Sequence, residues 1–182
     1  MIDFGEIVKL GPIDFIGADK IRSWRNDYSI WKWSRQNDLL LMQNQTDWLN
    51  SLPHRGDAKY YSIVSLTNNG VGVCGLSDID PVSRRAEFSI YIAPNEQGCG
   101  YAKPALKTLI SHGFNNLGLN TIWGETFTEN ERASKLFESI GFKLEGVRRS
   151  HYFKDGKFTD SKLYSILFDE WKASESFKRE QL

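Results

Sequence analysis

The turn from Gln97 to Ala102, with the sequence Q-G-C-G-Y-A, is well suited to bind a ligand, because Gly98 and Gly100 lie two positions apart. Glycine lets successive backbone N–H groups bend toward a phosphate, since no Cβ stands in the way. A helix that begins directly after the turn adds its dipole to those N–H groups. The turn has neither the G-K-[ST] ending of a P-loop nor the three-glycine spacing of a dinucleotide fingerprint, but it predicts a pyrophosphate site.

Two carboxylates could accept a proton from a substrate. Glu125 interrupts the apolar run of Ile122 and Trp123, and Glu87 begins the strand that leads into the glycine turn. Burial beside aromatic side chains would raise the pKa of either carboxyl group toward neutrality, which suits a general base. The alternative for Glu87 is an exposed partner of Arg85 or of a cation on a neighbouring strand.

Hydrophobic periodicity predicts the elements that position these residues. Phe88, Ile90 and Ile92 recur with period two, as in a strand with one face on a core. We expect strands at Ile7 to Leu10, Tyr60 to Leu66, Val71 to Ile79, Arg85 to Ile92, Thr121 to Phe127, Lys143 to Tyr152 and Lys162 to Phe168. We expect a helix capped by Asp19, helices at Thr46 to Leu52 and Pro104 to Leu117, a helix begun by Asn130, and a polar tail from Glu170 to Leu182. This order predicts an α/β fold with a mixed, mostly antiparallel central sheet flanked by helices.

Two blocks of the chain resemble motifs of a known family. The first is [QR]-x-x-G-x-[GA] between a strand and a helix, which Gln97, Gly100 and Ala102 match. The second is N-x-x-[AS]-x-x-[LF]-[YF]-E-x-x-G-F, which the run from Asn130 to Phe142 resembles. In this order and at this spacing, the blocks are similar to those of the Gcn5-related N-acetyltransferase (GNAT) superfamily. The pattern is most similar to its Rim-type, ribosomal-protein-alanine acetyltransferase-like branch.

The resemblance extends over nearly the whole chain and implies a single GNAT domain at residues 1–182. It implies an acyltransferase in which the first block holds the pyrophosphate of acetyl-CoA, with CoA as the product and no metal. The implied cofactor contacts are Ile92, Gln97, Gly98, Cys99, Gly100, Tyr101, Ala102, Asn130 and Phe137. Asn130 is also a good helix N-cap, and both roles can hold together.

Transfer of an acetyl group to an amine needs a base for the ammonium proton, because an ammonium ion is not a nucleophile. Glu125 lies in the strand where a carboxylate base occurs in family members that acetylate protein N-termini. The run around Glu87 resembles the corresponding strand of polyamine and ribosomal-protein acetyltransferases. These two residues are the candidate bases.

The general acid is where the chain departs from the family pattern. Phe137 stands where many members have a tyrosine, and Ala133 stands where others have a serine. The candidates that remain to protonate the thiolate are Ser134, Tyr152, Tyr164 and water.

The acceptor is predicted from the first fifty residues. The segment W-R-N from Trp24, followed by Trp31 and Trp33, resembles the N-terminal part of acetyltransferases that act on nucleotide-linked amino sugars. Tryptophan rings could stack on a base or sugar while Arg25 holds a phosphate. Trp24 and Trp48 are instead expected in the core. We therefore expect Arg25, Trp31 and Trp33 to bind the acceptor.

Several acceptors stay open at this point. A small amino compound such as a nucleotide-linked amino sugar is the first expectation, a protein N-terminal amine the second, and a polyamine the third. A different class of function, a non-catalytic module that binds acyl-CoA, is permitted by the missing tyrosine.

Composition excludes several broad classes of partner. The 182 residues carry 23 basic and 23 acidic side chains, so no global field favours nucleic acid or an anionic membrane. The two cysteines form no cluster with metal-ligand spacing, and no apolar run approaches membrane-spanning length. We expect a cytoplasmic enzyme without nucleic-acid or membrane partners, as a monomer or homodimer.

Overall fold

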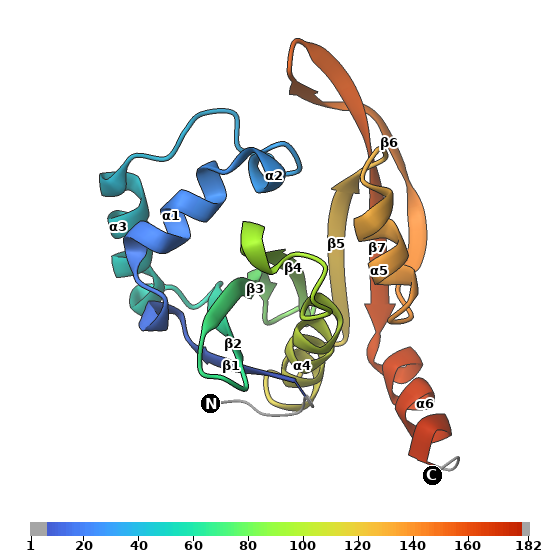
Figure 1. Cartoon of the computed structure of the whole chain (residues 1–182). Coiled ribbons are helices and arrows are strands. Elements are labelled where there is room, and N and C mark those ends of the chain that lie inside the picture. The colour runs from blue at the N-terminus through green and yellow to red at the C-terminus, as the bar shows by residue number, and fades with distance from the viewer. Residues whose placement is uncertain (1–6, 180–182) are drawn as a thin grey trace.

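One seven-stranded sheet, in the order β1-β2-β3-β4-β5-β7-β6, organises the molecule (Figure 1). The computed structural model describes residues 7–179 and, within that range, side chains up to residue 174. All neighbouring strands are antiparallel except β4 and β5, which are parallel. The strands are β1 (Val8–Pro12), β2 (Lys59–Ser65), β3 (Gly70–Asp80), β4 (Arg85–Ile92), β5 (Thr121–Phe127), β6 (Lys143–Lys154) and β7 (Lys157–Leu167). The expected fold class is confirmed.

The parallel pair β4 and β5 separates partway along its length. The two strands are paired only where Arg85–Glu87 lies beside Thr121–Trp123, although β4 continues to Ile92 and β5 to Phe127. Backbone groups beyond this point have no partner across the pair, and they need another partner when they are buried. A binding cavity lies at this separation.

Helices cover the sheet and frame the separation. The helices are α1 (Ala18–Asn26), α2 (Tyr28–Trp31), α3 (Met42–Ser51), α4 (Ala102–Asn115), α5 (Glu131–Glu138) and α6 (Phe168–Arg179), with 3-10 turns η1 (Ile13–Phe15), η2 (Leu52–His54) and η3 (Pro94–Glu96). Helix α4 lies against β1, β3 and β4 and buries Leu106, Leu109 and Ile110 in the main core. Helices α1, α2 and α3 lie on one side of β4, and α5 with the β6–β7 hairpin lies on the other (Figure 1).

The hairpin of β6 and β7 is longer than expected. It turns at Asp155 and Gly156, which both have positive φ, 51° and 77°. Two positive φ angles suit the tight two-residue turns whose twist matches the strands. Each strand therefore continues to the turn, which carries residues as far as Lys154 beyond the rest of the sheet.

Other boundaries differ from the expected ones for local reasons. Helix α1 begins at Ala18 with Gly17 as its N-cap, so Asp19 lies in the first turn and does not cap it. Helix α3 begins at Met42, earlier than Thr46, and the Asn44 side chain accepts a bond from the Leu41 N–H at 3.1 Å.

Two helices were not expected. The short helix α2 forms because the Asp27 side chain accepts the Ser29 N–H as an N-cap. Helix α6 replaces the expected polar tail, because Trp171 is buried in the main core and anchors the helix. Residues 180–182 of that tail lie outside the described residues. Within residues 7–179, no helix has the length and apolar character to cross a bilayer.

Candidate active site

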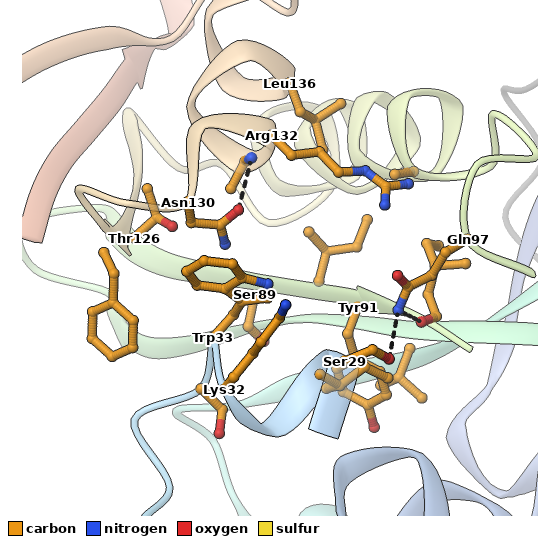
Figure 2. Close-up of a pocket in the computed structure, with 18 of the residues that line it drawn as sticks. Ser29, Lys32, Trp33, Ser89, Tyr91, Gln97, Thr126, Asn130, Arg132 and Leu136 are labelled. Carbon is orange, nitrogen blue, oxygen red and sulfur yellow. Dashed lines mark hydrogen bonds between the residues drawn. The ribbon is translucent and has the colours of Figure 1, made fainter. Parts of the chain in front are cut away.

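A cavity of about 1150 Å³ opens at the separation of β4 and β5. Its walls come from distant parts of the chain: the α2–α3 region, the end of β4, the glycine turn, the end of β5, and α5 (Figure 2). The hairpin contributes Tyr152. No single element carries the site, so tertiary packing creates it.

The glycine turn has the conformation that a pyrophosphate cradle needs. Gly98 and Gly100 have φ angles of +90° and +84°, and a Cβ at either position would meet open space within 4 Å. Glycine is required there by the left-handed backbone and not by crowding. The N-cap of α4, Tyr101, makes no side-chain cap, so the first-turn N–H groups of α4 are not satisfied by a side chain.

Two cations complete this end of the cavity. Lys103 lies in the first turn of α4, and Arg132 extends from α5 toward the side of the cavity where Gln97 lies (Figure 2). Unpaired helix N–H groups together with these charges fit a pyrophosphate. The residues of this chain therefore fit the phosphate portion of acetyl-CoA.

Eight of the nine residues expected to contact the cofactor line the cavity: Ile92, Gln97, Gly98, Gly100, Tyr101, Ala102, Asn130 and Phe137. Cys99 is exposed and does not line it. Gln97 braces the turn, because its amide nitrogen donates to Ser29 Oγ at 3.3 Å and to the Ile92 carbonyl at 3.4 Å. Asn130 caps α5, and its Oδ1 accepts the Ala133 N–H at 3.2 Å.

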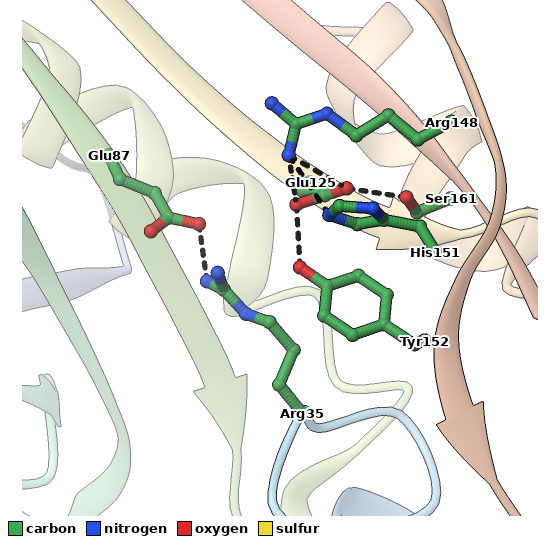
Figure 3. A network of polar contacts seen from close by, with 7 residues as sticks. All are labelled: Arg35, Glu87, Glu125, Arg148, His151, Tyr152 and Ser161. Atoms are coloured by element: carbon green, nitrogen blue, oxygen red, sulfur yellow. Dashed lines mark hydrogen bonds and ion pairs between the residues drawn. The ribbon is translucent and has the colours of Figure 1, made fainter.

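Glu125 is a buried carboxylate in a dense polar network (Figure 3). Its side chain is 2% exposed, and it accepts hydrogen bonds from Ser161 and, at 2.8 Å, from Tyr152. Arg148 pairs with it at 3.3 Å. Glu125 is opposite Leu163 in the β5–β7 register, so Ser161, two positions along, shares its face of the sheet.

The expectation that burial raises the pKa of Glu125 toward neutrality is wrong. Burial acts to raise the pKa of this carboxyl group, but the hydrogen bonds from Ser161 and Tyr152 and the charges of Arg148 and Arg35 outweigh burial. The pKa of Glu125 therefore lies below its ordinary value, and the group stays ionised at neutral pH.

Glu87 is the more basic of the two carboxylates. It is 4% exposed and forms an ion pair with Arg35, which rises from the loop after α2 (Figure 3). Burial raises the pKa of Glu87, and the Arg35 charge offsets only part of that effect. The alternative of an exposed partner of Arg85 is wrong, because Arg85 instead pairs with Asp80 at 3.5 Å.

The three hydroxyl candidates for the general acid have different surroundings. Ser134 is buried on the core side of α5 and does not line the cavity, so its placement does not fit an acid at the sulfur. Tyr164 is fully buried, and its hydroxyl donates to Glu138 at 2.9 Å. Tyr152 lines the cavity. Phe137, where the family has tyrosine, packs edge-on against Phe88 at 4.9 Å.

The expected acceptor residues are only partly brought together. Arg25 and Trp33 line the cavity, and Arg25 Nη2 donates to Gln36 Oε1 at 3.0 Å. Trp31 does not line it, because its ring lies beneath the ammonium group of Lys154 at 3.8 Å.

The two tryptophans expected in the core also differ. Trp24 is buried in a small cluster with Ile30 and Ala93, as expected. Trp48 lines the cavity instead, with its ring edge-on to Tyr60 at 5.0 Å.

Sequence reasoning missed Arg35, Arg148, Ser161 and Lys154. Arg35 and Lys154 meet their partners across separations of 52 and about 120 positions. No local pattern marks such pairs. For Ser161 a signal existed in principle, since period two places it on the face of Glu125 once the register of the two strands is known.

Comparison with known proteins identifies the family to which the chain belongs. The model of the acetyltransferase (GNAT) domain matches residues 11–143. The chain belongs to the GNAT acetyltransferase family. It is an N-acetyltransferase that takes the acetyl group from acetyl-CoA, so the expected family and enzyme class are confirmed. The matched residues end at the start of β6, so Tyr152 and Lys154 lie beyond them.

Relatives of this acetyltransferase cover most of its length. The uncharacterized N-acetyltransferase p20 of Bacillus licheniformis is 29% identical over 92% of this chain and 97% of its own. Spermidine N(1)-acetyltransferase of Vibrio cholerae is 32% identical over 63% of this chain and 66% of its own. A crystal structure of spermidine N-acetyltransferase from Vibrio cholerae in complex with CoA and spermine has a TM-score of 0.87 at 25% identity, and it covers 91% of this chain and 98% of the other.

Proposed function

We propose that this acetyltransferase acetylates a primary amine of a small polycationic acceptor of the polyamine class. The observation that carries the proposal is the position of the Glu125 carboxylate, which lies in the cavity wall and is held there by Tyr152, Ser161 and Arg148. A fixed negative charge in a site of low solvent access suits an ammonium group. The resemblance to spermidine acetyltransferases supports the polyamine alternative and not the nucleotide-linked amino sugar that was the first expectation.

The proposed reaction is direct attack of the amine on the thioester. The ammonium group first loses a proton, the nitrogen then bonds to the carbonyl carbon, and the carbon–sulfur bond breaks to leave the CoA thiolate. The nitrogen loses its second proton as the amide forms, and this proton balances the one that the thiolate takes up. Glu125 is a weak base because its pKa is lowered, so we assign it to binding an ammonium group of the polyamine other than the one that reacts. Glu87, whose pKa is raised, accepts the proton through a water molecule, because it does not line the cavity itself.

Tyr152 is the proposed donor to the thiolate. Tyr152 is the one among the three hydroxyl candidates that lines the cavity. Burial and the hydrogen bond to Glu125 raise the pKa of Tyr152, so the hydroxyl keeps its proton at neutral pH. To protonate the thiolate, the hydroxyl hydrogen must turn away from Glu125 Oε2, to which it is donated at 2.8 Å. Replacing Tyr152 by Phe should lower kcat and leave the KM for acetyl-CoA unchanged; an unchanged kcat would remove Tyr152 from this role.

The experiment is an acceptor series that measures CoA release. Spermidine and spermine are compared with short peptides and with nucleotide-linked amino sugars, for the wild type and for Glu125→Gln. We expect the highest kcat/KM with a polyamine, and a rise of about tenfold or more in its KM for Glu125→Gln, because a charge-assisted contact is lost.

The control is Asp169→Asn, which removes an exposed carboxylate in the first turn of α6, outside the cavity. It should leave the acceptor KM unchanged. A preference of the wild type for peptides or for nucleotide-linked amino sugars would overturn the polyamine assignment and leave the acetyltransferase activity intact.

A further inference from the structure

Lys154, the last residue of β6, is a buried lysine at the tip of the hairpin. Its side chain reaches the segment that follows α2, and its ammonium group donates to three backbone carbonyls. These are the carbonyls of Trp31 at 2.9 Å, Ser34 at 2.9 Å and Gln36 at 2.6 Å. A buried ammonium group is costly unless its donors are satisfied, and here all three N–H donors have an acceptor.

The same lysine contacts the segment in a second way. The Lys154 Nζ lies 3.8 Å from the centre of the Trp31 ring. A cation over the face of tryptophan adds attraction that is strongest where water is excluded. Lys154 is 6% exposed, so this contact is largely shielded from solvent.

The segment held by Lys154, residues 31–36, forms one wall of the cavity. Residues 32–36 all line it. Arg35 projects from this segment to pair with Glu87, and Gln36 accepts the hydrogen bond from Arg25. The position of this wall therefore depends on a lysine about 120 residues further along the chain.

We propose that Lys154 is a positioning residue for the acceptor side of the site, because it fixes residues 31–36 so that Arg35 meets Glu87. Among the residues that the structure describes, the hydrogen bonds and the ring contact of Lys154 go to residues 31–36 and not to the glycine turn or α5, so its effect falls on the acceptor and not on acetyl-CoA. The inference rests on the proposed transfer to an amine.

The charges around Glu87 and Lys154 predict how the pH dependence of kcat/KM changes when Lys154 is replaced. Glu87 faces Arg35, Asp78 and Glu125, and of these only Arg35 lowers its pKa. Lys154 itself faces Asp155 at the turn, and burial lowers the pKa of the lysine. When the segment is released, Arg35 moves from Glu87, the pKa of Glu87 rises, and the acidic limb of kcat/KM moves to higher pH.

The first test is steady-state kinetics of Lys154→Met with the best acceptor. We expect the acceptor KM to rise about tenfold or more, which is the scale of lost charge-assisted hydrogen bonds. The KM for acetyl-CoA should stay within about twofold, and the acidic limb should shift upward in pH. Lys154→Arg keeps a cation with several donors and should recover part of the loss.

The matched control is Lys143→Met, which removes an exposed lysine from the other end of β6, where it pairs with Glu170. This control should change neither KM. A Lys154→Met variant that loses activity only in proportion to its folded fraction, with both KM values and the pH profile unchanged, would reduce Lys154 to a stabilising role and overturn the proposal.

A second measurement needs neither an acceptor nor the methionine variant. Hydrogen exchange of residues 31–36 is compared between the wild type and Lys154→Gln, which keeps a donor amide but no charge. We expect exchange at this segment to speed up by about tenfold or more, with the glycine turn unchanged. Equal exchange rates would overturn the positioning role even if no polyamine is acetylated, so this failure is distinct from failure of the proposed function.

Discussion

At the scale of single residues, different surroundings shift the pKa values of two glutamates in opposite directions. Glu125 and Glu87 are both buried on neighbouring strands, and burial acts on both in the same direction. Glu125 has two hydroxyl donors and the charges of Arg148 and Arg35, which together outweigh burial, whereas for Glu87 only Arg35 opposes burial. One group is thereby kept charged, and the other is made more basic.

This difference predicts the pH dependence of catalysis. In the wild type, Glu87 must be ionised to accept a proton, so kcat/KM rises as pH increases through its raised pKa. Glu87→Gln should remove this rise, the acidic limb of the pH profile. It should also lower kcat/KM by roughly 10²- to 10⁴-fold, the usual scale of general-base catalysis. The loss should shrink at high pH, where free amine is abundant.

The measurement is a pH profile of kcat/KM for the wild type, Glu87→Gln and Glu125→Gln. In the Glu125→Gln variant the acidic limb should remain, because Glu87 is still present. A profile of Glu87→Gln that keeps the limb, with a loss below about fivefold, would assign the proton to another group.

At the scale of elements, the glycine turn and α4 form a unit whose conformation follows from local residue choice. Gly98 and Gly100 take left-handed backbone angles, and the turn passes directly into α4. Pro104 lies in the first turn of α4, where a missing N–H is tolerated. The β6–β7 hairpin depends on distant residues instead: Lys154 near its tip is buried against residues 31–36, whereas Phe153 and Phe158 beside it are exposed.

Gly100→Glu tests the turn as a pyrophosphate site. The substitution places a side chain and a negative charge beside the N–H groups that would hold phosphate, so affinity for acetyl-CoA should fall by about tenfold or more. The matched control is Gly118→Glu, because Gly118 also has a positive φ, +65°, but lies outside the cavity.

Binding is measured by calorimetry with acetyl-CoA on both folded variants. Both variants bear the cost of a glutamate in the left-handed backbone region. The difference between their affinities for acetyl-CoA therefore measures the effect of the substitution on the binding site. Equal affinity of Gly100→Glu and Gly118→Glu for acetyl-CoA would place the pyrophosphate elsewhere.

At the scale of the whole molecule, the site exists because one parallel pair in the sheet separates and distant segments meet there. The α2–α3 segment, the glycine turn, α5 and the hairpin each supply one wall. Helix α6 follows β7 at the end of the strand away from the hairpin turn (Figure 1), and Trp171 packs it against the core. Stability and catalysis are therefore partly separable, because α6 supports the sheet without reaching the cavity.

Trp171→Ala should reveal that separation. Trp171 is 6% exposed, so its loss should lower the free energy of unfolding by about 3–5 kcal/mol, the usual cost of truncating a buried aromatic residue. The KM values for both substrates should be unchanged in the folded protein. Urea denaturation and kinetics measure the two effects, with the exposed neighbour Lys172→Ala as control. An altered KM for either substrate would show that α6 is coupled to the site.

Most of the strands and helices, and the family, could be predicted from the sequence alone, whereas helices α2 and α6 could not. Period two marks β4, paired glycines mark the turn, and the two motif blocks mark acetyl-CoA chemistry, because these signals are local and survive without knowledge of the fold. Tertiary structure decided what no local pattern contains. It turned Ser134 toward the core and Trp31 beneath Lys154, and it brought Arg35 to Glu87. It also set the opposite pKa directions of Glu87 and Glu125, since a pKa sums the burial and charges of groups that only folding brings together.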